Sequence, residues 1–224
     1  MSLQHGSIES FFLEGEAGRL EALLNLGLPG AEYACLVCHP HPLFGGTMHN
    51  KVVFHAMKAL NAFGFPVLRF NFRGAGTSAG EHDNGRGEVA DVQVALDYLA
   101  KRFSVPIIFA GFSFGAAIGL RAAVPYPQVQ ALIALGLPVE ADRREYSYTF
   151  LQESKKPKLF LSGGNDQFAN PEQLTQIFAS ASDPKRLVII PGADHFFAGH
   201  LDKMRAALGG WVREVIGPAE IPAV

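Results

Sequence analysis

The stretch PIIFAGFSFGAAIGLRAA, residues 106–123, decides the fold of this chain. It combines an apolar run, the G-x-S-x-G string Gly111–Gly115 and a segment of small and apolar residues. This order predicts a strand, a sharp turn and a buried helix. A serine on such a turn projects from the sheet edge, and small neighbours avoid clashes in the strained backbone. The context favours Ser113 as a nucleophile over an ordinary helix-capping serine.

A second G-x-S-x-G match, Gly76–Gly80, lacks this context. The residues after it, EHDNGR, form a polar string in which we expect no helix, so Ser78 is not favoured. The loop Gly74–Gly80 also resembles a dinucleotide-binding glycine loop. That fingerprint should follow the first strand of a βαβ unit and open directly into a helix. Because this loop does neither, we expect no nucleotide, and the chemistry proposed below needs no cofactor.

Near-continuous apolar runs alternate along the chain with segments of helical period, as in a doubly wound α/β sheet. The first two expected strands form an antiparallel pair around a turn. We expect one domain over residues 1–217 and a loose tail over residues 218–224. The expected strands are Ile8–Glu14, Arg19–Gly27, Tyr33–Cys38, Pro66–Asn71, Pro106–Ala110, Val129–Leu135, Lys158–Leu161 and Arg186–Ile190, and the expected helices are Asn50–Phe63, Gly87–Arg102, Phe114–Ala123, Pro171–Ser180 and His200–Val215.

Composition narrows the class of protein. With 224 residues, 48% of them hydrophobic and a formal net charge of -2, the chain suits one globular core and offers no basic surface for nucleic acid. No apolar run approaches the roughly 20 residues of a membrane span, and the first residues lack the pattern of a secretory signal. Cys35 and Cys38 lie three apart on an expected strand, on opposite faces and about 10 Å apart, which excludes a disulfide. Buried free thiols are typical of proteins of the reducing cytoplasm. The sequence is also compatible with a homodimer.

A serine nucleophile needs a general base and a group that orients this base. The runs KLFLSGG and RLVIIPGA lead into Asn165–Asp166 and Asp194–His195, respectively. Because parallel strands end at one edge of the sheet, both residues are expected on the same rim as Ser113. Asp194 is a rival acid, but a carboxylate next to the histidine in sequence rarely reaches its ring nitrogen. We therefore predict Ser113, His195 and Asp166 as nucleophile, base and orienting acid.

Backbone N–H donors must stabilise the oxyanion of the reaction. One is expected from Phe114, directly after the nucleophile. The second is expected from the loop HPHPLFGG, residues 39–46, in which the two prolines have no N–H. His41 or Leu43 must then donate, and we favour His41. The two histidines of this loop also invite a metal site, but no acidic or cysteine cluster surrounds them, so we expect no metal.

The strings HPHPLFGGTMHN, RFNFRGAGTSAG, GFSFG, GGNDQF and GADHFF, in this order, resemble the α/β-hydrolase superfamily. The resemblance is to its small, nearly lidless branch, related to dienelactone hydrolases. It implies an α/β-hydrolase fold with an eight-stranded, mostly parallel sheet flanked by helices, and a cofactor-free Ser-His-Asp mechanism. Dienelactone hydrolases use a cysteine nucleophile, so the serine here puts their substrate in doubt.

Lipase-like relatives insert a large cap where this chain has only residues 138–156, enough for a minimal cap of one helix. Either the aromatic residues of this segment line an acyl pocket or they pack the loop onto the body. The candidate pocket residues of this segment are Tyr146, Tyr148 and Phe150. The oxyanion loop adds Leu43 and Phe44.

These observations predict a serine hydrolase that cleaves small carboxylic esters with short acyl chains, a preference suggested by the open site. A thioesterase, a lactonase or a peptidase of the same fold remains an alternative, because all share the nucleophile and its base. From another class, a non-catalytic binding module of this fold also stays open.

Overall fold

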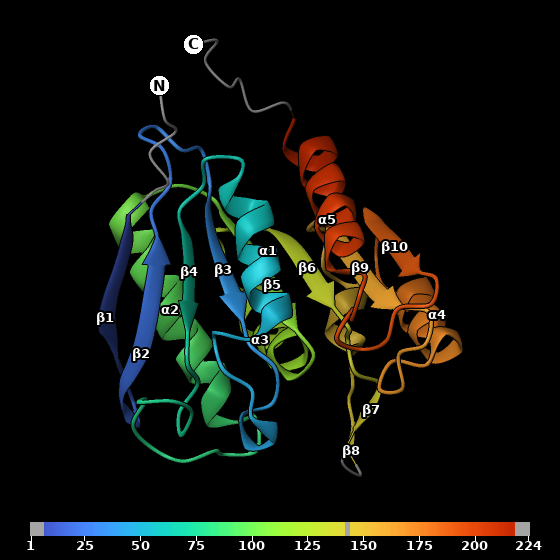
Figure 1. Cartoon of the computed structure of the whole chain (residues 1–224), viewed down its shortest axis with the longest axis horizontal. Coiled ribbons are helices and arrows are strands. Elements are labelled where there is room, and N and C mark those ends of the chain that lie inside the picture. The colour runs from blue at the N-terminus through green and yellow to red at the C-terminus, as the bar shows by residue number, and fades with distance from the viewer. Residues whose placement is uncertain (1–6, 142–143, 218–224) are drawn as a thin grey trace.

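The computed structural model describes residues 7–141 and 144–217. Eight strands form one sheet in the order β1-β2-β4-β3-β5-β6-β9-β10 (Figure 1). Strand β2 pairs antiparallel with β1 and β4, and the other neighbours pair in parallel. The predicted eight-stranded, mostly parallel sheet is confirmed. Its strands are β1 (Ile8–Gly15), β2 (Gly18–Asn25), β3 (Ala34–Cys38), β4 (Val67–Phe70), β5 (Ile107–Phe112), β6 (Val129–Leu135), β9 (Lys158–Gly163) and β10 (Lys185–Ile190).

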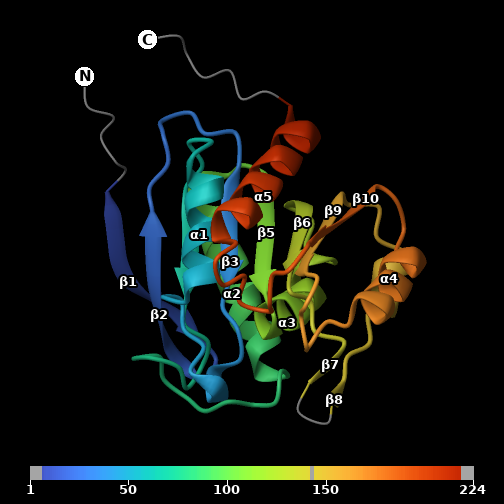
Figure 2. The same ribbon diagram turned by 45° about the vertical axis from the view of Figure 1, so that its right-hand side comes forward.

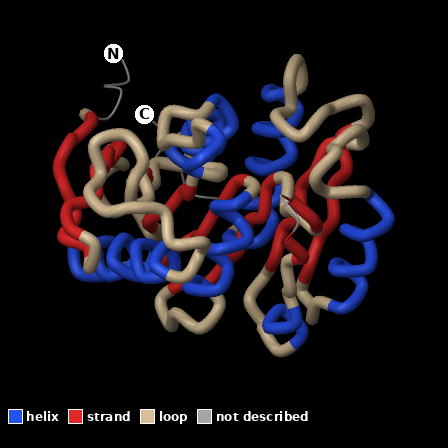
Figure 3. The backbone as a smooth tube through the Cα atoms, turned by 90° about the horizontal axis from the view of Figure 1, so that it is seen from below, coloured by secondary structure: helices blue, strands red, loops and turns tan. Residues whose placement is uncertain are grey.

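Helices cover both faces of the sheet, as Figures 2 and 3 show from two further directions. Successive side chains of a strand point to opposite faces. Accordingly, Ile107 and Phe109 of β5 belong to one core cluster, and Ile108 and Ala110 belong to the other. The first cluster packs against α2 (Gly87–Phe103), α3 (Phe114–Ala123) and α4 (Pro171–Ser180), and the second against α1 (Lys51–Asn61) and α5 (Leu201–Ile216).

Strand β3 shows why the two cysteines do not react with each other. Cys38 belongs to the core cluster beneath α2 and α3, and Cys35 belongs to the cluster beneath α1 and α5. Both thiols are free and buried, and burial raises the pKa of each well above its ordinary value. The prediction of two unpaired thiols on opposite faces is confirmed.

The segment between β6 and β9 is short, and its described residues form no lid. It contains the small hairpin β7 (Glu140–Ala141) and β8 (Arg144–Glu145) and one turn of 3-10 helix, η2 (Thr149–Gln152). The expected single helix is therefore reduced to this one turn. In the described part of the chain, no helix is long and apolar enough to cross a membrane. The predicted tail, residues 218–224, lies outside the described residues.

The parallel strands all end at the lower edge of the sheet in Figure 1. The loops that leave β3, β5, β6, β9 and β10 therefore meet at one rim. In open α/β sheets, ligands bind at this carboxyl edge. The predicted nucleophile, base and acid lie on these loops, so the topology directs the search for a site to this rim.

Candidate active site

Ser113 lies between β5 and α3 in a backbone conformation that few residues other than glycine adopt, with φ 54° and ψ −121°. The turn is tight: a Cβ on Gly111 would lie 2.5 Å from the carbonyl oxygen of Gly115, and a Cβ on Gly115 would lie 2.4 Å from that of His39. Both flanking glycines are therefore required sterically. Ser113 occupies the N-cap position, yet within the described chain its side chain makes no capping hydrogen bond. A residue in such a conformation costs about 1–3 kcal/mol, and capping by the Ser113 side chain does not offset this cost.

Asp166 and His195 form a buried pair at the same rim. The Nδ1 atom of His195 lies 2.9 Å from each carboxylate oxygen of Asp166, and the two residues are only 2% and 4% exposed, respectively. Asp166 follows β9 and His195 follows β10, as the sequence predicted. Because a carboxylate only accepts hydrogen bonds, Nδ1 carries the proton and Nε2 is left as the acceptor. The ring is thus held in the form that a general base needs.

Several donors hold the carboxylate of Asp166 in place and charged. Its Oδ1 accepts the N–H groups of Phe168 and Ala169 at 2.9 and 3.1 Å, and its Oδ2 accepts the Ser162 hydroxyl at 3.1 Å. Burial alone raises the pKa of this carboxyl, but the hydrogen bond and charge of His195, with the Phe168 and Ser162 donors, lower it further than burial raises it. The net pKa lies below the ordinary value.

Aromatic rings enclose the ring of His195. The ring centroids of Phe168, Phe112 and Phe196 lie 4.7, 5.0 and 5.2 Å from that of His195. On the remaining side, a Cβ on Gly136 would lie 3.1 Å from the imidazole. These contacts restrict the ring to one orientation.

Asp194 and Ser78, the alternatives to Asp166 and Ser113 in the sequence, make other contacts. The Oδ1 atom of Asp194 accepts the N–H of Ala198 at 2.8 Å, so this carboxylate caps the following turn. The hydroxyl of Ser78 donates to the carbonyl of Asn71 at 2.7 Å and accepts the N–H of Glu21 at 2.9 Å. Both groups stabilise local backbone, and neither is directed at the His195 ring.

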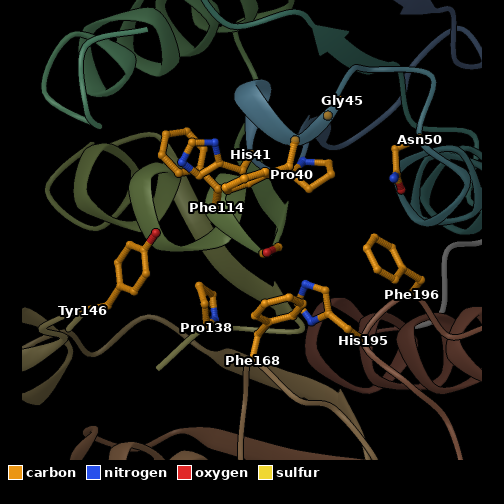
Figure 4. Close-up of a pocket in the computed structure, with 13 residues that line it drawn as sticks. Pro40, His41, Gly45, Asn50, Phe114, Pro138, Tyr146, Phe168, His195 and Phe196 are labelled. Atoms are coloured by element: carbon orange, nitrogen blue, oxygen red, sulfur yellow. The ribbon is translucent and has the colours of Figure 1, made fainter. Parts of the chain in front are cut away.

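Ser113 and His195 line one cavity of about 330 Å³, at the small end of the range for ligand pockets. Figure 4 shows Tyr146 and Pro138 on one side of it and Asn50 and Phe196 on the other. Among the described residues, no hydrogen bond joins Ser113 to His195; such bonds are often long in unliganded enzymes and tighten with substrate. The lining residues are Pro40, His41, Phe44, Gly45, Gly46, Asn50, Ser113, Phe114, Pro138, Tyr146, Phe168, His195 and Phe196.

The predicted pocket residues divide into two groups. Phe44 and Tyr146 line the cavity. Three others do not, and here the prediction was wrong. Leu43 is 68% exposed on the short 3-10 turn η1 (Pro42–Phe44). Tyr148 is buried with its hydroxyl donating to the Pro138 carbonyl at 2.5 Å, and Phe150 packs against the core, so both tie the loop to the body.

Sequence reasoning missed four lining residues with a clear structural role. Asn50 is the N-cap of α1, and its side-chain oxygen accepts the N–H of Val52 at 2.9 Å. Pro138 lies just beyond β6. Phe168 and Phe196 follow Asp166 and His195 by two residues and one residue. Their position beside the predicted acid and base was a usable signal, because neighbours on a rim loop share its surroundings.

The two predicted oxyanion donors belong to the segments that follow β5 and β3. Phe114 is the first residue of α3, and the N–H groups of the first helical turn have no partner within the helix. In the other loop, the Leu43 N–H donates to the His41 ring at 3.3 Å, which counts against Leu43 as the second donor. Among the described residues, no group of three or more metal-ligating side chains is present.

The described residues have the fold of an α/β serine hydrolase without a lid, and Ser113 lies at the carboxyl edge of its sheet. The profile of the α/β-hydrolase domain family matches residues 44–205. The chain therefore belongs to this family.

Similar proteins span nearly the whole chain. An uncharacterised protein of Rickettsia prowazekii is 35% identical over 90% of this chain and 87% of its own length. A solved α/β serine hydrolase homologue from Coxiella burnetii is 37% identical, with a TM-score of 0.83 over 91% of this chain and 97% of that one. A serine hydrolase without a lid from Xanthomonas campestris is 33% identical, with a TM-score of 0.83 over 100% of both chains.

Proposed function

We propose that the protein is a cofactor-independent serine hydrolase, similar to a carboxylesterase. It cleaves small, uncharged carboxylic esters with short acyl groups through an acyl-enzyme on Ser113. One observation carries this proposal: the buried Asp166–His195 pair opens onto the same cavity as a serine held in a strained turn. A pure binding module would gain nothing from the cost of this strain or from burying a carboxylate beside an imidazole.

In the first half of the reaction, the Oγ of Ser113 attacks the ester carbonyl carbon while Nε2 of His195 takes the hydroxyl proton. Asp166 accepts the Nδ1–H bond and stabilises the imidazolium. The N–H groups of Phe114 and His41 stabilise the oxyanion. The tetrahedral intermediate then collapses, and the ester C–O bond breaks. His195 gives its proton to the leaving alcohol, and the acyl group stays on Ser113.

In the second half, water attacks the acyl carbon and gives a proton to Nε2 of His195. The new tetrahedral intermediate collapses, the bond to Ser113 breaks, and His195 returns the proton to the Ser113 oxygen. The carboxylic acid leaves, and the enzyme is regenerated with no net change. No step needs an oxidant, a metal or an organic cofactor.

The cavity supports an uncharged substrate. Of the described residues that line it, none is Asp, Glu, Lys or Arg, and most of its wall is aromatic ring, proline or glycine. A charged acyl or alcohol group would lose its hydration there without gaining an ionic partner. The small volume and the absence of a lid favour short acyl groups over long chains. The two buried cysteines fit a cytoplasmic setting.

Covalent labelling with a fluorophosphonate tests the proposal directly. We expect the wild type and the Ser78→Ala variant to be labelled and the Ser113→Ala variant not to be labelled. Ser78→Ala is the matched control because it removes the serine of the other G-x-S-x-G string. Hydrolysis of nitrophenyl esters of increasing chain length, beside acyl thioesters and lactones, then identifies the substrate. A folded wild type that resists labelling and cleaves no ester would refute the proposed function.

A further inference from the structure

His39, the first residue after β3, is fully buried and uses both of its ring nitrogens. Its Nε2 accepts the backbone N–H of Phe72 at 3.0 Å, and its Nδ1 lies 2.6 Å from the carbonyl oxygen of Pro40. A backbone N–H can only donate and a carbonyl oxygen can only accept. Nδ1 must therefore carry the proton and Nε2 must not. The ring is neutral and fixed in one tautomer.

The hydrogen bond at Nδ1 sets the orientation of one peptide unit. The carbonyl of Pro40 and the N–H of His41 belong to the same planar, trans peptide, so the two bonds point in opposite directions. Because the carbonyl is directed at the buried ring of His39, the N–H of His41 is directed away from it. Pro40 and His41 both lie at the wall of the cavity that contains Ser113 (Figure 4).

The chain after His41 is fixed by separate contacts. The carbonyl of His41 accepts the N–H groups of Phe44 and Gly46 at 3.2 and 3.0 Å, which closes the turn η1. These bonds fix the peptide after His41, not the one before it. Pro40 and Pro42 add rigidity but no donor. The hydrogen bond from His39 to the Pro40 carbonyl holds the peptide before His41, to which the His41 N–H belongs.

We propose that His39 is a positioning residue for ester hydrolysis: its Nδ1–H holds the Pro40 carbonyl so that the His41 N–H faces the oxyanion. This inference rests on the proposed function, because it gives the His41 N–H a role only if Ser113 forms a tetrahedral intermediate. The two ring bonds have different tasks. The bond at Nδ1 orients the donor, whereas the bond at Nε2 joins the loop to the end of β4.

Two substitutions separate these tasks. In His39→Asn, the amide nitrogen takes roughly the place of Nδ1 and keeps the bond to the Pro40 carbonyl, while the acceptor for Phe72 is lost. In His39→Gln, the amide oxygen reaches the place of Nε2 and keeps the Phe72 bond, while the donor to Pro40 is lost. Each variant removes one buried hydrogen bond, so we expect both to lower the melting temperature.

The activities should differ. Loss of an oxyanion donor lowers kcat by on the order of 100- to 1,000-fold. In His39→Gln the donor is misdirected but still present, so we expect kcat to fall by about 10- to 100-fold with little change in KM. Its affinity for a boronic acid that mimics the tetrahedral intermediate should fall by a similar factor. His39→Asn should keep kcat and this affinity within about threefold of the wild type.

The outcomes distinguish the two proposals. Equal losses of kcat in both variants, or no loss in His39→Gln, would overturn the positioning role while leaving Ser113 as the nucleophile. A wild type that is neither labelled nor active overturns the proposed function and this inference together. If one variant does not fold, the other still decides, because His39→Asn must keep kcat and His39→Gln must lose it.

Discussion

Acidification acts on the stability of this protein through His39. Burial lowers the pKa of this imidazole from 6.5 to about 4; the nearby His41 lowers it too, and the hydrogen bond to Pro40 opposes the shift. Between these two pH values the unfolded chain binds a proton at His39 and the folded chain does not. The free energy of unfolding therefore falls as the pH falls through this window. A difference of about 2.5 pKa units corresponds to about 3 kcal/mol, fully lost near pH 4.

Urea unfolding at a series of pH values measures this loss. Trp211, the single tryptophan, is buried in α5 and reports unfolding by its fluorescence. The His39→Gln variant cannot bind the proton, so its stability should fall less steeply, and the difference between wild type and variant should change by about 3 kcal/mol between pH 7 and pH 4. His49→Gln, which removes an exposed imidazole, is the control. Parallel curves for wild type and His39→Gln would refute the reasoning.

Three further predictions concern the acid and the loop anchors. Asp166→Asn should lower kcat for nitrophenyl acetate by on the order of 1,000- to 10,000-fold, because the tautomer of His195 is no longer fixed. The control Asp194→Asn should retain most of the activity. The reverse result would identify Asp194 as the acid. Lys158→Met should lower the free energy of unfolding by about 3 kcal/mol in urea titrations. The substitution leaves three carbonyls, one buried and two partly buried, without the ammonium that now donates to them at 2.7–2.8 Å. Tyr148→Phe should lower the free energy of unfolding by about 1–2 kcal/mol with kcat unchanged, since the hydroxyl donates to a buried carbonyl. A large fall in kcat would show that Tyr148 contributes to the substrate pocket.

Elements with a clear apolar run or a clear helix-capping signal were predictable to the residue. The strand Val129–Leu135 and the helices Phe114–Ala123 and Pro171–Ser180 have the predicted bounds. Strand β5 runs two residues further than predicted, because Gly111 and Phe112 still pair with β6 despite belonging to the turn motif. The β7–β8 hairpin was not predicted. Its strands have two residues each, too few for any period to emerge in the sequence.

The roles of the aromatic residues between β6 and β9 could not be predicted from the neighbouring sequence. Tyr146 and Tyr148 are two apart and chemically identical, yet only Tyr146 lines the cavity. Tyr148 is turned inward by its bond to the Pro138 carbonyl, a partner ten residues away in the chain. Leu43 and Phe44 are adjacent on one turn, and only Phe44 reaches the cavity wall.

The amino-acid sequence by itself determined the class of fold, the strained turn at Ser113 and the order in which acid and base follow it. These features depend on short-range steric rules and on the period of apolar residues, which are written locally in the chain. Only the tertiary structure decided which carboxylate holds His195, which side chains form the cavity wall, and that His39 is neutral and directed at Pro40. Those outcomes depend on contacts between loops far apart in sequence, whose distances arise only when the sheet brings its strand ends to one edge.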